Sequence, residues 1–271
     1  MKISLPQIWL PAKAIALVAA LGLTLAIAPH GSAATSAADD ANTEPRSGEY
    51  RVTVFPYHRI NDEFTGFGYL GYVSNPDKDY QTAYLGYGAS YTPSPTVQWW
   101  AGLVSTYTNN LASADKLELR PFVGLKNLIP NKIKWNIYNY ARWEYRGIQD
   151  RTSGDWVRYS RFRDRFGVEF PLASGEQAWK PGTWYGLADA EVMYRFDKSQ
   201  VDPCRLRAGI AYIFSNRVRA EFIYHAQWTR PGGGDLKFTD NIFRLNIKVA
   251  MTKGRLLDRL INPGLDSGLD D

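Results

Sequence analysis

The sequence predicts an all-β protein, an antiparallel transmembrane β-barrel of about ten strands, with twelve as the alternative. Segments in which apolar and charged side chains alternate follow one another from Tyr50 to Met251. Nearly all of the nine Trp and seventeen Tyr lie in this region, and a barrel can display such residues at both membrane interfaces. Beyond residue 34, no apolar run approaches the roughly 20 residues that a membrane-spanning helix requires.

Residues 1–34 have the composition of a cleaved signal peptide. Lys2 and Lys13 precede a stretch of mostly Ala, Leu, Ile and Val, and small residues follow it at 31–34. An uncleaved anchor is the alternative, but the next residues are polar and no basic cluster follows. We therefore expect export to the cell outer membrane, with outer-membrane lipid and, during biogenesis, the barrel-assembly machinery as partners. The expected organisation is a signal peptide (1–34), a polar linker (35–48), a β-barrel (49–252) and a periplasmic C-terminal tail (253–271).

The barrel region divides into ten segments of strand-like length, separated by turn residues. They are Phe64–Val73, Gln81–Tyr91, Thr96–Thr106, Lys116–Lys126, Ile133–Ile148, Trp156–Phe170, Trp184–Phe196, Arg205–Phe214, Arg217–Thr229 and Asn241–Met251. Tyr50–Tyr57 is a further candidate, which either continues the next strand through a bulge or belongs to a set of twelve. An even number would place both termini in the periplasm, with short periplasmic turns alternating with longer external loops. Residues 171–183 are the exception, because this connection is long but falls in a periplasmic position.

The alternation within these segments gives each strand one apolar and one charged face, because successive side chains point to opposite faces. In 116–126, for example, Glu118 and Arg120 share one face while Leu117 and Leu119 share the other. In a soluble sandwich the apolar face would lie inside, whereas in a membrane barrel it meets lipid. The aromatic residues at the ends of the apolar faces favour the membrane barrel, and a secreted soluble β-protein remains the alternative.

Composition excludes several function classes. The formal charge of +5 falls to +3 without Lys2 and Lys13, and Arg is spread along the chain rather than clustered, so no nucleic-acid partner is expected. Cys204 is the only cysteine, which excludes an intramolecular disulfide and a cysteine metal site. The loop acids Asp77, Asp79, Asp235 and Asp240 lack the regular spacing of a calcium site. We expect neither metal nor cofactor.

The charged faces predict the residues that line the lumen. Two interpretations stay open: ion pairs that fill a narrow lumen, which we favour because acids alternate with arginines, or a basic path that selects anions. The predicted lumen residues are Arg120, Arg142, Glu144, Arg146, Arg161, Arg163, Arg165, Glu169, Glu191, Arg195, Arg207, Arg219, Glu221, His225 and Arg244, together with Asp189 and Lys248.

Catalysis is not expected. A Ser–His–acid set requires its members within hydrogen-bond reach, and His225 lies about 13 Å along an extended strand from Glu221, the acid on its own face. No catalytic residue is assigned, and a barrel enzyme that modifies envelope lipid remains an alternative. The sequence thus predicts an outer-membrane barrel of unassigned role, structural or serving small solutes, of unknown oligomeric state.

Five motifs resemble those of one bacterial barrel family. They are residues 118–122 (ELRPF), 141–146 (ARWEYR), 159–163 (YSRFR), 214–221 (FSNRVRAE) and 241–245 (NIFRL). In this order and spacing they are similar to domain of unknown function 2490, over roughly residues 49–251. The resemblance implies an outer-membrane barrel and no reaction. The last strand, however, lacks a terminal aromatic residue, and the tail with Leu256, Leu257, Leu260 and Ile261 is expected to form a short periplasmic helix.

Overall fold

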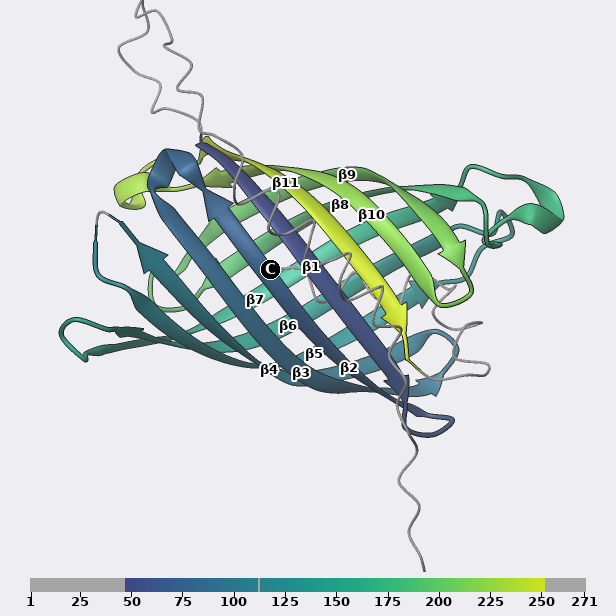
Figure 1. Ribbon diagram of the computed structural model, residues 1–271, viewed down its shortest axis with the longest axis horizontal. Coiled ribbons are helices and arrows are strands. Elements are labelled where there is room, and N and C mark those ends of the chain that lie inside the picture. The colour runs from purple at the N-terminus through teal and green to yellow at the C-terminus, as the bar shows by residue number, and fades with distance from the viewer. Residues whose placement is uncertain (1–46, 112, 252–271) are drawn as a thin grey trace, which may run out of the picture. The chain divides into compact units, whose positions relative to one another are not determined.

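The computed structural model describes residues 47–111 and 113–251, and the predicted signal peptide and C-terminal tail lie outside them (Figure 1). The described residues form eleven strands and three short 3-10 helices, and no described helix has the length and apolarity needed to cross a membrane. The strands are β1 (Ser47–Arg59), β2 (Phe64–Asn75), β3 (Tyr80–Ser94), β4 (Val97–Asn110), β5 (Lys116–Ile129), β6 (Asn136–Asp150), β7 (Trp156–Pro171), β8 (Trp184–Arg195), β9 (Gln200–Ser215), β10 (Val218–Thr229) and β11 (Lys237–Ala250).

The eleven strands close into one barrel. Consecutive strands pair antiparallel, and β1 and β11 complete the ring as a parallel pair, with Val52 opposite Leu245 (Figure 1). The predicted count of ten or twelve was therefore wrong by one, and 50–57 belongs to a strand of its own. The even-number argument assumed that every neighbouring pair is antiparallel, and one parallel seam removes that requirement. The described chain consequently enters the barrel at one end and leaves it at the other.

The connections at one end of the barrel are not consistently shorter than those at the other end. One end carries connections 76–79, 111–115, 151–155, 196–199 and 230–236, and the other carries 60–63, 95–96, 130–135, 172–183 and 216–217. The longest connection, 172–183, shares an end with the two shortest and is the exception that the sequence already indicates. Connection 130–135 at the same end is also longer than every connection at the other end except 230–236, so the predicted alternation does not hold. The strand predicted from Ile133 begins three residues later, because the Asn131 side chain accepts hydrogen bonds from the backbone amides of Ile133 (3.2 Å) and Trp135 (3.1 Å) and holds a turn there.

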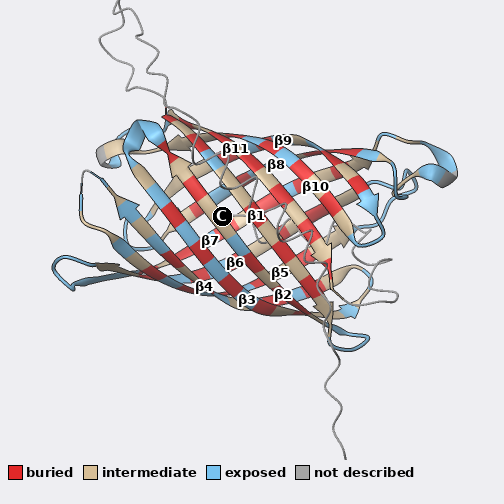
Figure 2. Cartoon of the chain, viewed as in Figure 1, coloured by how far each residue is buried: buried red, intermediate tan, exposed pale blue. Residues whose placement is uncertain are grey.

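Burial alternates along each strand, as the two-residue period predicts (Figure 2). In β7, Arg161, Arg163 and Arg165 are buried, whereas Phe162 and Phe166 are exposed. In this strand the charged side chains therefore face the barrel interior and the apolar ones face outward. This is the reverse of the arrangement in a water-soluble barrel.

Aromatic side chains fill the part of the interior bounded by β1 to β6. This aromatic cluster is formed chiefly by Phe55, Tyr57, Phe67, Tyr69, Tyr84, Trp100, Phe122, Tyr138 and Tyr140. Glycines on the inner face make room for the rings. A Cβ atom at Gly88 would lie 2.5 Å from the Phe67 ring and 2.4 Å from the carbonyl oxygen of Ala101, closer than van der Waals contact allows. A second, smaller apolar cluster on β8 to β10 consists of Tyr185, Leu187, Ala211, Ile213 and Ile223, and charged side chains fill much of the remaining interior.

Candidate functional site

The barrel interior contains the predicted lumen residues, most of them buried. Among the described residues, those at most 9 % exposed are Arg120, Arg142, Glu144, Arg161, Arg163, Arg165, Glu169, Asp189, Glu191, Arg207, Arg219, Glu221, His225, Arg244 and Lys248. Arg146 and Arg195 are only partly buried and lie towards the barrel end that carries Ser47. Arg195 donates a 2.7 Å hydrogen bond to Asp197 in the adjacent loop, because its strand ends there.

Glu144 on β6 holds the largest group of arginines. It accepts from Arg161 Nε at 2.8 Å and from Arg163 NH1 at 3.0 Å, and it also pairs with Arg142 two residues away on the same face of β6. Its side chain is 0 % exposed. Burial of a carboxylate is tolerated where its charge is paired and its oxygens accept hydrogen bonds, and Glu144 meets both conditions.

The pairing continues across the wall to β8 and β9. Arg163 NH2 donates to Glu191 at 2.7 Å, and Arg165 NH2 donates to the same oxygen at 2.7 Å. Asp189 receives a two-pronged pair of bonds from Arg207, both of 2.6 Å, and lies 3.9 Å from Arg165 Nε. Arg205 lies 3.6 Å from the other oxygen of Glu191. The result is one connected set of six arginines and three acids, which we call the central network: Arg142, Glu144, Arg161, Arg163, Glu191, Arg165, Arg205, Asp189 and Arg207.

Two smaller clusters lie towards the barrel ends. Glu118 accepts two 2.5 Å bonds from Arg146 and one of 2.8 Å from Arg120. Towards the other end, Glu221 accepts from Lys248 at 2.7 Å and from the Tyr185 hydroxyl at 2.6 Å. Ion pairs thus occur along the interior from one end of the barrel to the other.

Sequence reasoning missed several interior charges. Glu118, Lys126 and Arg205 are buried, and each lies two residues from another inward-facing side chain, so strict application of the alternation would have included them. Among the described residues, eleven buried Arg and Lys face eight buried Asp and Glu, an excess of three positive charges. The interior is therefore cationic as a whole, although its pairs are closely matched.

His225 does not belong to a Ser–His–acid set. Its ring is 0 % exposed, and neither ring nitrogen has a hydrogen-bond partner within the described part of the chain. Glu221, the nearest acid on its strand, bonds instead to Lys248, Tyr185 and Asn246. Arg207 lies directly opposite His225 on β9. The arrangement offers neither an activated hydroxyl nor an acid that would orient the imidazole.

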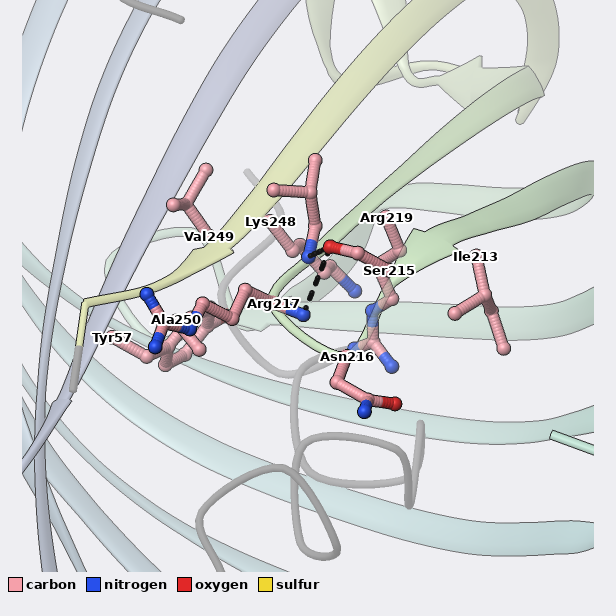
Figure 3. Close-up of a pocket in the computed structure, with 10 residues that line it drawn as sticks. Tyr57, Ile213, Ser215, Asn216, Arg217, Arg219, Lys248, Val249 and Ala250 are labelled. Atoms are coloured by element: carbon pink, nitrogen blue, oxygen red, sulfur yellow. Dashed lines mark hydrogen bonds between the residues drawn. The ribbon is translucent and has the colours of Figure 1, made fainter. Parts of the chain in front are cut away.

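A small pocket lies at the turn between β9 and β10, between Tyr57, Ile213, Arg219 and Ala250 (Figure 3). The Ser215 hydroxyl accepts from the backbone amides that follow it, at 3.2 and 3.1 Å, and this shapes the turn. The pocket has a volume of about 20 Å³, which is room for roughly one water molecule.

Among residues 47–251, apart from 112, no three His, Cys, Asp or Glu side chains gather as a metal ion would require.

Fold and site together define a class of protein: a closed β-barrel with an apolar outer face and an ion-paired, arginine-rich interior. The family model described as protein of unknown function (DUF2490) matches residues 43–237, and the chain belongs to this family. The match spans β1 to β10, so it includes the central network. A comparison with curated proteins found no match.

Proposed function

We propose that the protein is an outer-membrane β-barrel whose lumen is closed by the central network, and that it serves as a structural envelope protein rather than an open pore. The inversion of polarity carries this proposal. Large apolar side chains that are more than a third exposed cover the outer face, among them Leu70, Leu85, Trp99, Leu103, Val123, Trp143, Phe162, Phe166, Leu206, Ile210 and Phe222. A contiguous apolar surface of this extent is costly in water and favourable in lipid.

Strand length and the N-terminus support a membrane location. The strands have 12 to 16 residues, longer than the roughly 9–11 residues that a tilted strand needs to cross a bilayer. The signal-peptide features of residues 1–34 provide the route of export. Heat-modifiable migration on a detergent gel tests this part, since a lipid-embedded barrel keeps its compact form until it is boiled. Recovery of the protein in a soluble periplasmic fraction would contradict it.

The burial of the central network supports a closed lumen. Its charged side chains are at most 9 % exposed, so they fill the middle of the interior and leave little room for water between them. Purified protein in planar bilayers should therefore give no discrete conductance steps. A variant with Arg163→Ala and Glu191→Ala removes two side chains that meet in the middle of the interior and should conduct, whereas an alanine pair at Arg195 and Asp197 should not. Steps from the unchanged protein would refute closure.

The excess of positive charge favours one second candidate, a gated anion path. Rings of Arg and Lys select anions in known pores, and the unpartnered nitrogens of His225 lie among these arginines. In this case the unchanged protein would conduct, and its reversal potential in a salt gradient would have the sign of anion selectivity. Arg163→Glu should shift that potential towards cation selectivity, and the absence of a shift would exclude this path.

A further inference from the structure

One ionisable side chain interrupts the apolar outer face at the middle of a strand. Asp164 is the ninth of the sixteen residues of β7. Arg163 and Arg165, on either side of it, are buried, and Phe162 and Phe166, which share its face, are 37 % and 53 % exposed. Asp164 therefore points outward. Other charged residues on the outer face of the described strands lie at or near strand ends, where water or lipid headgroups can solvate them.

Within the described part of the chain, Asp164 has one side-chain partner. Asn139 on β6 donates from Nδ2 to one carboxylate oxygen at 2.8 Å, and the same nitrogen lies 3.3 Å from the carbonyl oxygen of Arg165. The second carboxylate oxygen accepts no hydrogen bond from another described residue. A charged group in lipid at mid-depth is costly and usually marks a functional contact. The neutral amide of Asn139 leaves one of the two oxygens of the Asp164 carboxylate without a donor.

Two alanines lie beside Asp164 on the neighbouring strands, among the larger side chains of Val192, Phe162 and Phe166. Ala141 on β6 and Val192 on β8 lie directly opposite it, and Ala190 is paired with Phe166 on the neighbouring strand. Small residues beside a polar group are typical of contacts between protein chains in a membrane, because they let the two backbones come near enough for hydrogen bonds.

We propose that the Asp164–Asn139 patch on β6 and β7 binds a second copy of this chain within the membrane. The proposal rests on the membrane location argued above. Lipid tails offer no hydrogen-bond donor at this depth, whereas a second copy offers the amide of its own Asn139. The patch carries an acceptor and a donor side by side, and a two-fold axis between β6 and β7 would place the carboxylate of each copy against the amide of the other. The amide would exchange its longer contact, with the Arg165 carbonyl, for the partner's carboxylate.

Cysteine cross-linking of the full chain in lipid vesicles tests this contact. The background is Cys204→Ala, which removes the native thiol. Ala141→Cys places a thiol beside Asp164, and Ala89→Cys is the matched control: also an alanine, similarly half-buried, outward-facing, and on β3. Under a mild oxidant, Ala141→Cys should give a disulfide-linked dimer with the mass of two copies, about tenfold more than Ala89→Cys. Adding Asp164→Ala should weaken the dimer about tenfold, equivalent to about 1.4 kcal/mol.

Each outcome decides one point. If the variants are heat-modifiable membrane barrels and both cysteines cross-link equally, the contact surface is wrong while the membrane location stands. A cross-link to a different protein excludes the second copy, and an unchanged dimer in Asp164→Ala excludes the carboxylate as its cause. If the unmodified chain is not a membrane barrel, the proposed function itself fails. Asp164→Asn keeps the size of the side chain and one oxygen acceptor but removes the charge, so it should retain most of the dimer. This variant controls for the possibility that Asp164→Ala loses the dimer because it misfolds.

Discussion

Replacing Glu144 with glutamine should destabilise the barrel by about 3–5 kcal/mol, the range for breaking a buried ion pair from one side. Three arginines meet this carboxylate, and its side chain is 0 % exposed. Arg163 keeps its bonds to Glu191, but Arg161 loses its carboxylate partner and receives the amide of glutamine in its place. The shape is conserved, so the loss reflects charge and hydrogen bonding rather than a cavity.

The measurement is denaturant unfolding of the refolded barrel in detergent, followed by tryptophan fluorescence and by the heat-modifiable gel shift. Asp197→Asn is the control, because Asp197 pairs with Arg195 at the surface (2.7 Å) and exposed pairs contribute about 0–1 kcal/mol. The double variant with Arg161→Gln removes both charges and should recover part of the loss, since residues in contact show coupling of about 0.5–3 kcal/mol.

A Glu144→Gln variant no less stable than Asp197→Asn would refute this reasoning. It would mean that water enters the interior and screens the arginines, and the closed lumen would then be untenable. Strict additivity of Glu144→Gln and Arg161→Gln would indicate that the two side chains are not energetically coupled.

Three further predictions concern closure, packing and a loop. In the Cys204→Ala background, Val52→Cys with Leu245→Cys should form an intramolecular disulfide across the parallel seam, and persistent free thiols after oxidation would count against an eleven-strand ring. Gly88→Val should greatly reduce the yield of heat-modifiable barrel, because the side chain would overlap an aromatic ring and a carbonyl; a normal yield would show that the cluster can repack. The Tyr107 hydroxyl donates a 2.6 Å hydrogen bond to Asp115 and thereby lowers the pKa of this carboxyl. The contact between these two residues should therefore persist above about pH 4 and be lost as the pH falls further. The backbone amide of Asn110 donates to the same carboxylate at 3.1 Å. Its hydrogen-exchange rate, corrected for the intrinsic rate, should rise as the pH falls through that window, and Asp115→Asn should abolish this pH dependence.

The sequence by itself determined the fold class and the two faces of the strands. The alternation at Arg161, Phe162 and Arg163 is local, since successive side chains of any extended chain point to opposite sides. It therefore identified the charged face without knowledge of the neighbouring strands. The same rule places Glu118 and Arg205 in the interior, where both are buried, although the predicted lumen set omits them.

Only the tertiary structure decided how the strands meet. Which arginine pairs with Glu144 depends on the register between β6 and β7, and the odd strand count depends on a parallel contact between segments nearly two hundred residues apart. Neither follows from local periodicity, because pairing register and ring closure are properties of the whole sheet. The meaning of Asp164 also emerged only there. On the sequence it is one more acid among arginines, and its place in the middle of the apolar outer face separates it from the interior pairs.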